Sequence, residues 1–122
     1  MAEKLTPGQL RRIDQLREFI KAVEHVKKLV AELDGSRAAR PKIIEGICAS
    51  IARELSQLRQ RAMAANVGTV GDAAGAMAVL AGRGGGLPMK IRGLTEGTAG
   101  LMMQLDQSLK QALTPEKEKK ES

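Results

Sequence analysis

The near absence of aromatic side chains constrains the fold of this chain more than any other feature of its sequence. Its 122 residues include one Phe and neither Trp nor Tyr, although the hydrophobic share of 43% is ordinary for a globular protein. The core must therefore be built from Leu, Ile, Val, Ala and Met. These residues suit helices packed on helices better than sheets, in which aromatic and β-branched residues are enriched. The length fits one domain, and we expect it to be all-α.

The first helix is predicted from a capping signal followed by a heptad-like pattern. Thr6 is placed as the N-cap, Pro7 occupies the first helical position, and Gln9 stands where a capping box requires Glu or Gln. Apolar residues then recur at alternating spacings of three and four, which marks one face of a helix. They are Leu16, Phe19, Val23, Val26, Val30 and Leu33. Gly35 can adopt the left-handed conformation that ends a helix.

A second helix with the same pattern is expected to begin at Pro41. Its apolar face consists of Ile44, Cys48, Ile51, Leu55, Leu58 and Ala62. Because only residues 36–40 separate the two helices, we expect them to be antiparallel neighbours. Cys48 lies within the apolar pattern, so we interpret it as a small buried hydrophobic residue.

Two further helices complete the predicted bundle. Thr69 is expected to cap the third, whose residues 73–81 are almost wholly small, and Pro88 lies at the start of the fourth. Gly93, Gly97 and Gly100 of the fourth helix indicate close contact with the third. The glycine-rich residues 82–86 between them are expected to form a flexible connection.

These patterns predict an antiparallel four-helix bundle over residues 1–114, followed by a disordered charged tail over residues 115–122. The aromatic-poor core is thin, so we expect self-association into a homo-oligomer to bury additional apolar surface. The sequence contains neither a secretory hydrophobic region nor a stretch long enough to span a membrane. We therefore expect a cytoplasmic protein without a membrane association.

The excess of positive charge is the main indication of function. The net charge is +6, and residues 35–92 carry nine basic but only three acidic residues. Clustered arginines without aromatic residues are typical of contacts with the phosphate backbone of structured RNA or duplex DNA, rather than with single-stranded bases. The candidate nucleic-acid-binding residues are Arg37, Arg40, Lys42, Arg53, Arg59, Arg61, Arg83, Lys90 and Arg92.

The residues required for common kinds of catalysis and cofactor binding are scarce. One His and one Cys cannot supply a structural zinc site, and no cofactor is expected. His25 is interpreted as a surface histidine rather than as a phosphotransfer site. The glycine-rich segment lacks the Gly-x-x-x-x-Gly-Lys-Ser/Thr pattern of a phosphate-binding loop. We therefore do not expect an enzyme.

Methionines in the second half of the chain suggest a surface for protein partners. Met102 and Met103 are adjacent and cannot both face one seam, so at least one points to another surface. Together with Leu109 they form the candidate partner interface. We therefore favour a non-enzymatic accessory subunit that binds nucleic-acid backbone through a basic stripe and proteins through Met and Leu faces. The alternative is a purely protein–protein adaptor or assembly scaffold without nucleic-acid binding.

Overall fold

The structure is a computed structural model that describes residues 4–115, and within that range it contains four α-helices and no strand. The helices are α1 (Pro7–Gly35), α2 (Pro41–Ala64), α3 (Gly68–Gly82) and α4 (Leu87–Ala112). The prediction of an all-α chain with four helices is thereby confirmed for these residues. The predicted charged tail lies, except for Pro115, outside the described residues.

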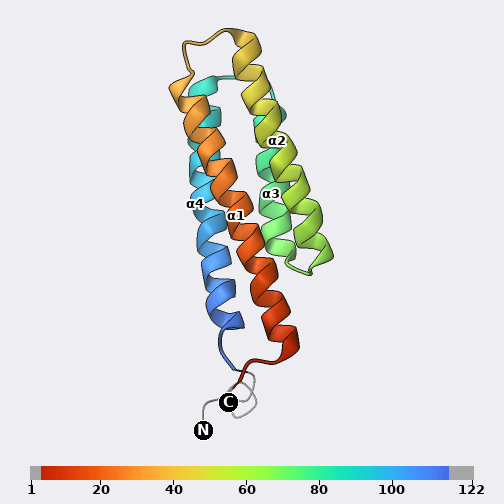
Figure 1. Cartoon of the computed structure of the whole chain (residues 1–122). Coiled ribbons are helices and arrows are strands. Elements are labelled where there is room, and N and C mark those ends of the chain that lie inside the picture. The colour runs from red at the N-terminus through yellow and green to blue at the C-terminus, as the bar shows by residue number, and fades with distance from the viewer. Residues whose placement is uncertain (1–3, 116–122) are drawn as a thin grey trace.

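The four helices lie side by side in an elongated bundle (Figure 1). Along the chain, α1 runs toward the upper end of the view, α2 returns, α3 runs upward again and α4 returns. Each helix packs against two others, whereas the diagonal pairs α1–α3 and α2–α4 make no close backbone contact. The α1–α2 and α3–α4 connections consequently lie at the same end of the bundle, which we call the connection end.

The opposite end is closed by the N-terminal cap of α1. The Gln9 backbone amide donates to Thr6 Oγ1 at 3.1 Å, and the Thr6 amide donates to Gln9 Oε1 at 2.9 Å. The predicted capping box is therefore confirmed. The Gln9 Nε2 group also donates to the Thr114 carbonyl at 2.6 Å, so this cap joins the start of α1 to the end of α4.

The predicted cap of α3 at Thr69 is wrong. The helix begins at Gly68, with Val67 as its N-cap and no side-chain cap. Main-chain bonds close the short α2–α3 link instead. The Val67 amide donates to the Ala62 carbonyl at 2.8 Å, and the Gly71 amide donates to the Val67 carbonyl at 3.1 Å. These bonds start the helix before Thr69, which remains exposed.

The apolar residues predicted for the faces of the two long helices form most of the core. All six residues of the α1 pattern are buried, and so are five of the six in the α2 pattern. The exception is Ile44, which is half-buried, while Ile47 is buried. Cys48 is 7% exposed, in agreement with its interpretation as a small core residue.

Small residues let α3 and α4 pack closely. A Cβ atom added at Gly93 would lie 2.6 Å from Leu80 Cδ2, and one added at Gly97 would lie 2.7 Å from Met77 Sδ. Both glycines therefore accommodate large side chains of α3, which confirms the predicted contact at these two positions. Gly100 differs, because a Cβ there would meet no atom within 4 Å.

Candidate functional site

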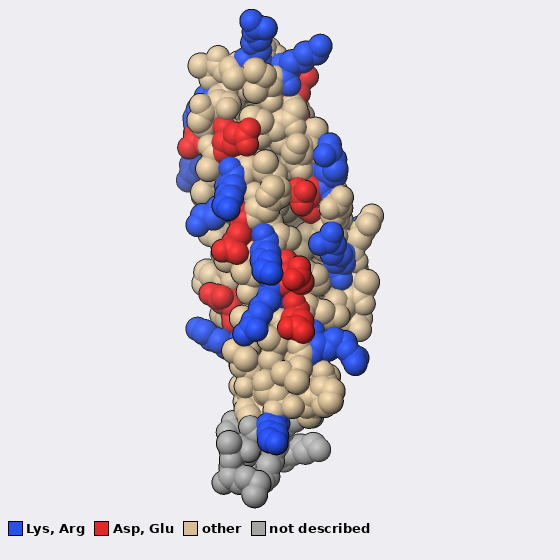
Figure 2. Space-filling view, in the orientation of Figure 1, with Lys and Arg blue, Asp and Glu red and all other residues tan. Residues whose placement is uncertain are grey.

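Two segments distant in sequence bring six of the nine candidate cations to the connection end. Residues 37–42 follow α1, residues 83–92 follow α3, and Pro41 and Arg83 line the same cavity. Blue side chains project at this end, at the top of the view in Figure 2. The six residues, which we call the connection-end cations, are Arg37, Arg40, Lys42, Arg83, Lys90 and Arg92.

Most of the connection-end cations remain available to an external anion. Two form ion pairs: Arg37 Nε lies 2.7 Å from Asp34 Oδ1, and Arg92 Nε lies 3.3 Å from Glu96 Oε1. Both pairs are exposed, so each stabilises the fold by less than about 1 kcal/mol and can be exchanged for another anion. The other four cations form no ion pair within residues 4–115.

Backbone amides at the connection end are also free of side-chain caps. Neither α2 nor α4 has a side-chain N-cap bond or an acidic residue in its first turn. Pro41 and Pro88 have no amide hydrogen, and the Ile43 amide donates to the Arg40 carbonyl at 2.9 Å, so these helix starts offer an anion few backbone donors. Because α1 and α3 end where α2 and α4 begin, the helix dipoles offset one another. The charged side chains, rather than the helix dipoles, therefore determine the electrostatic potential at the connection end.

The three remaining candidate arginines lie further along α2 and face different directions. At 3.6 residues per turn, Arg59 and Arg61 point about 160° apart, and Arg53 points about 120° from Arg59. The Arg59 side chain leans on α3, because a Cβ added at Gly75 would lie 2.8 Å from its Cδ. All three arginines are exposed. The structure does not bring them together with one another or with the connection-end cations.

The candidate partner residues differ in how far they reach the surface. Met103 is 65% exposed, whereas Met102 and Leu109 are half-buried against the core. Met102 lines a groove of about 620 Å³ between α1 and α4. Thr95 and Thr98 also line it, but their hydroxyl groups donate to backbone carbonyls of α4 at 2.7 and 2.9 Å. The groove is therefore mainly apolar.

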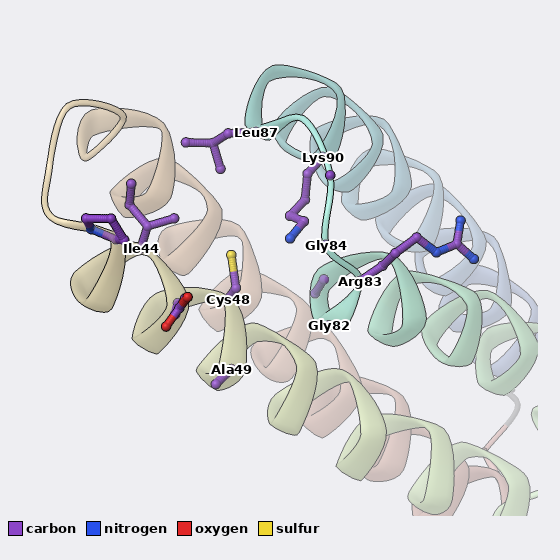
Figure 3. A pocket seen from close by; sticks show the side chains of 12 residues that line it. Ile44, Cys48, Ala49, Gly82, Arg83, Gly84, Leu87 and Lys90 are labelled. Atoms are coloured by element: carbon purple, nitrogen blue, oxygen red, sulfur yellow. The ribbon is translucent and has the colours of Figure 1, made fainter.

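A second cavity, of about 500 Å³, lies at the connection end. Figure 3 shows it between the N-terminal half of α2 and the segment that joins α3 to α4, with Ile44, Cys48, Leu87 and Lys90 around it. The helical periodicity does not predict this cavity. The glycine run 82–86 was the available indication, because glycines supply no side chains to fill the space beside them.

Within residues 4–115 no three His, Cys, Asp or Glu residues lie close enough to hold a metal ion. His25 is exposed on α1, and its Nε2 lies 3.8 Å from Glu54 Oε1. In the same range, no helix combines the length and the apolar character that crossing a bilayer requires.

Comparisons of the chain with protein-family models, with curated proteins and with solved structures find no match. The surface and the cavities of the bundle are therefore the guide to its function.

Proposed function

We propose that this antiparallel bundle, with a flexible glycine-rich α3–α4 connection, is a non-enzymatic accessory subunit that binds the phosphate backbone of nucleic acid at its connection end. The observation that carries the proposal is the meeting of two basic segments there. Residues 34–45 and 83–96 together contain six Lys or Arg residues and three Asp or Glu residues. Two of the three carboxylates are already engaged in exposed ion pairs.

The connection end is suited to backbone contact without sequence reading. Helix axes in a bundle lie about 8–10 Å apart, so its end is roughly 20 Å across. Duplex DNA carries one phosphate charge per ~1.7 Å of its axis, so several phosphates lie within that width. The only aromatic residue of the chain, Phe19, is 4% exposed and cannot stack on bases. These features favour duplex DNA or structured RNA over single strands.

Charge reversal at two locations tests this proposal. The double variant Arg40→Glu/Lys42→Glu reverses two charges at the connection end. The control variant Arg59→Glu/Arg61→Glu changes the net charge by the same amount, but on the flanks of α2. Binding to a labelled duplex and to an RNA hairpin would be measured by fluorescence anisotropy at one low salt concentration. Two lost charge-assisted contacts predict roughly 100-fold weaker binding for the first variant on both ligands.

The control variant is expected to bind within about threefold of the wild type, because only long-range screened charge has changed. Equal losses in both variants would show that net charge alone drives association, and the connection end would lose its assigned role.

A second candidate function, a protein–protein adaptor, is favoured by the groove between α1 and α4. Met102 lines this groove, and Met103 beside it is largely exposed. Methionines adapt to varied apolar partners, including a second copy of this chain. The test is sedimentation of the wild type and of Met103→Glu. Self-association that disappears in the variant while its helical circular dichroism is unchanged supports a role of this surface in assembly; a wild-type monomer argues against a scaffold built from copies of this chain.

A further inference from the structure

The cavity at the connection end is open because side chains are missing on one side. Here α3 ends at Gly82 and α4 begins at Leu87, so a glycine-rich bridge passes the N-terminal half of α2. Cβ atoms added at Gly82, Gly84 or Gly85 would meet nothing within 4 Å. All three glycines line the cavity, so the bridge side of this volume is bounded mainly by backbone.

The opposite side of the cavity presents apolar surface. Ile44 belongs to the apolar pattern of α2, yet it is half-buried, because the bridge opposite supplies nothing to cover it. In Figure 3 the Cys48 sulfur and the Leu87 side chain also face this space. A ligand with an apolar body would remove these groups from water, and burial of such surface is worth about 25 cal/mol per Å².

Lys90 supplies the polar group of the cavity. It is half-buried, whereas the other eight candidate cations are exposed. Figure 3 shows its ammonium group extending from α4 into the space between α2 and the bridge, while Arg83 points away. Glu45 also lines the cavity, but it is exposed and not within ion-pair distance of Lys90. A partly desolvated ammonium group without a counter-ion favours an anion from outside.

We propose that this cavity binds a small amphipathic carboxylate, whose apolar body lies against Ile44, Cys48 and Leu87 and whose carboxylate pairs with Lys90. The volume of about 500 Å³ falls within the range of small-molecule sites, about 300–1,000 Å³. The proposal does not depend on nucleic-acid binding, because Lys90 turns inward and the five exposed connection-end cations are sufficient for the proposed phosphate contacts.

The only cysteine of the chain lies in this cavity, so its reactivity reports on occupancy. Alkylation of Cys48 by iodoacetamide would be followed by mass spectrometry at increasing concentrations of octanoate or of octan-1-ol. We expect octanoate to slow the reaction at lower concentrations than octanol does, because only octanoate can pair with Lys90.

Two variants assign this difference to the lysine. Lys90→Gln is expected to weaken protection by octanoate about tenfold or more and to leave protection by octanol unchanged. Lys110→Gln removes an exposed lysine in the last turn of α4 and is expected to behave as the wild type. The proposal is overturned if octanoate gives no protection, if octanol protects equally well, or if Lys90→Gln retains the full effect.

Discussion

Replacing Gly97 by Ala adds one methyl group where α4 packs against the Met77 side chain. The new Cβ would lie 2.7 Å from Met77 Sδ, 2.9 Å from its Cε and 3.0 Å from its Cγ. Rotation of the terminal methyl group alone cannot relieve three such contacts. Met77 is only 6% exposed, so it has little space into which to move.

The expected change in stability is the difference between two terms of known size. Overpacking a core of this kind costs about 1–3 kcal/mol. Ala is favoured over Gly inside a helix by about 1 kcal/mol. We therefore expect Gly97→Ala to lower the free energy of unfolding by roughly 1 kcal/mol, within a range of about zero to 2 kcal/mol.

Gly100 is the matched control, because it lies one turn further along the same helix and a Cβ there would meet nothing within 4 Å. Gly100→Ala is expected to raise the free energy of unfolding by up to about 1 kcal/mol. The two variants should then differ by about 2 kcal/mol, which corresponds to roughly 8 °C in Tm for a domain of this size. Urea and thermal unfolding followed by circular dichroism measure both quantities.

A double-mutant cycle identifies the cause of the difference. Met77→Ala removes all three contacting atoms, so in that background Gly97→Ala should become stabilising by up to about 1 kcal/mol. The reasoning is refuted if Gly97→Ala in the wild-type background stabilises the protein as much as Gly100→Ala does. That result would mean that the Met77 side chain does not occupy the space beside Gly97.

Three further substitutions test the fold and its surface. Thr6→Ala removes the acceptor of the capping box and should lower the free energy of unfolding by about 1 kcal/mol in urea titrations; an unchanged midpoint would contradict the cap. Leu55→Ala, at a fully buried site, should cost about 2–5 kcal/mol, whereas Val79→Ala, at a site 58% exposed, should stay within about 0.5 kcal/mol. Similar losses in these two variants would contradict the assigned core. Asp34→Asn releases Arg37 from an exposed ion pair, so the free energy of unfolding should change by less than about 1 kcal/mol. The affinity of this variant for duplex DNA should rise a few-fold. A loss of affinity would exclude Arg37 from the binding surface.

The buried faces of α1 and α2 were predictable because alternation of three and four residues specifies which positions point inward. The burial of Ile47 and the partial exposure of Ile44 were not predictable, because they depend on what lies opposite α2 at these positions. The periodicity of apolar residues indicates which positions of a helix point inward. It does not show that the glycine bridge beside Ile44 has no side chains to cover that residue. The prediction of a cap at Thr69 was wrong because main-chain hydrogen bonds in the α2–α3 link start the helix earlier, at Gly68.

The candidate site was predictable as a set of residues but not as an arrangement. Sequence spacing does not show that residues 37–42 and 83–92 meet, because that depends on which connections share an end of the bundle. The divergence of Arg59 and Arg61 follows from helical geometry alone and could have been anticipated from their separation of two positions. The inward direction of Lys90 was not predictable, because spacing along α4 does not show that α2 and the glycine bridge enclose a cavity beside it.

The salt dependence of binding to duplex DNA tests the proposed backbone contact most directly. Three exposed cations without ion pairs, Arg40, Lys42 and Arg83, and two more in exchangeable pairs allow about three to five phosphate contacts. With about four contacts, the slope of log K against log salt concentration is roughly −3.6, so affinity should fall about 150-fold between roughly 50 and 200 mM salt. A loss of less than about fivefold over that range, or no binding at the lower concentration, would contradict the proposed backbone contact.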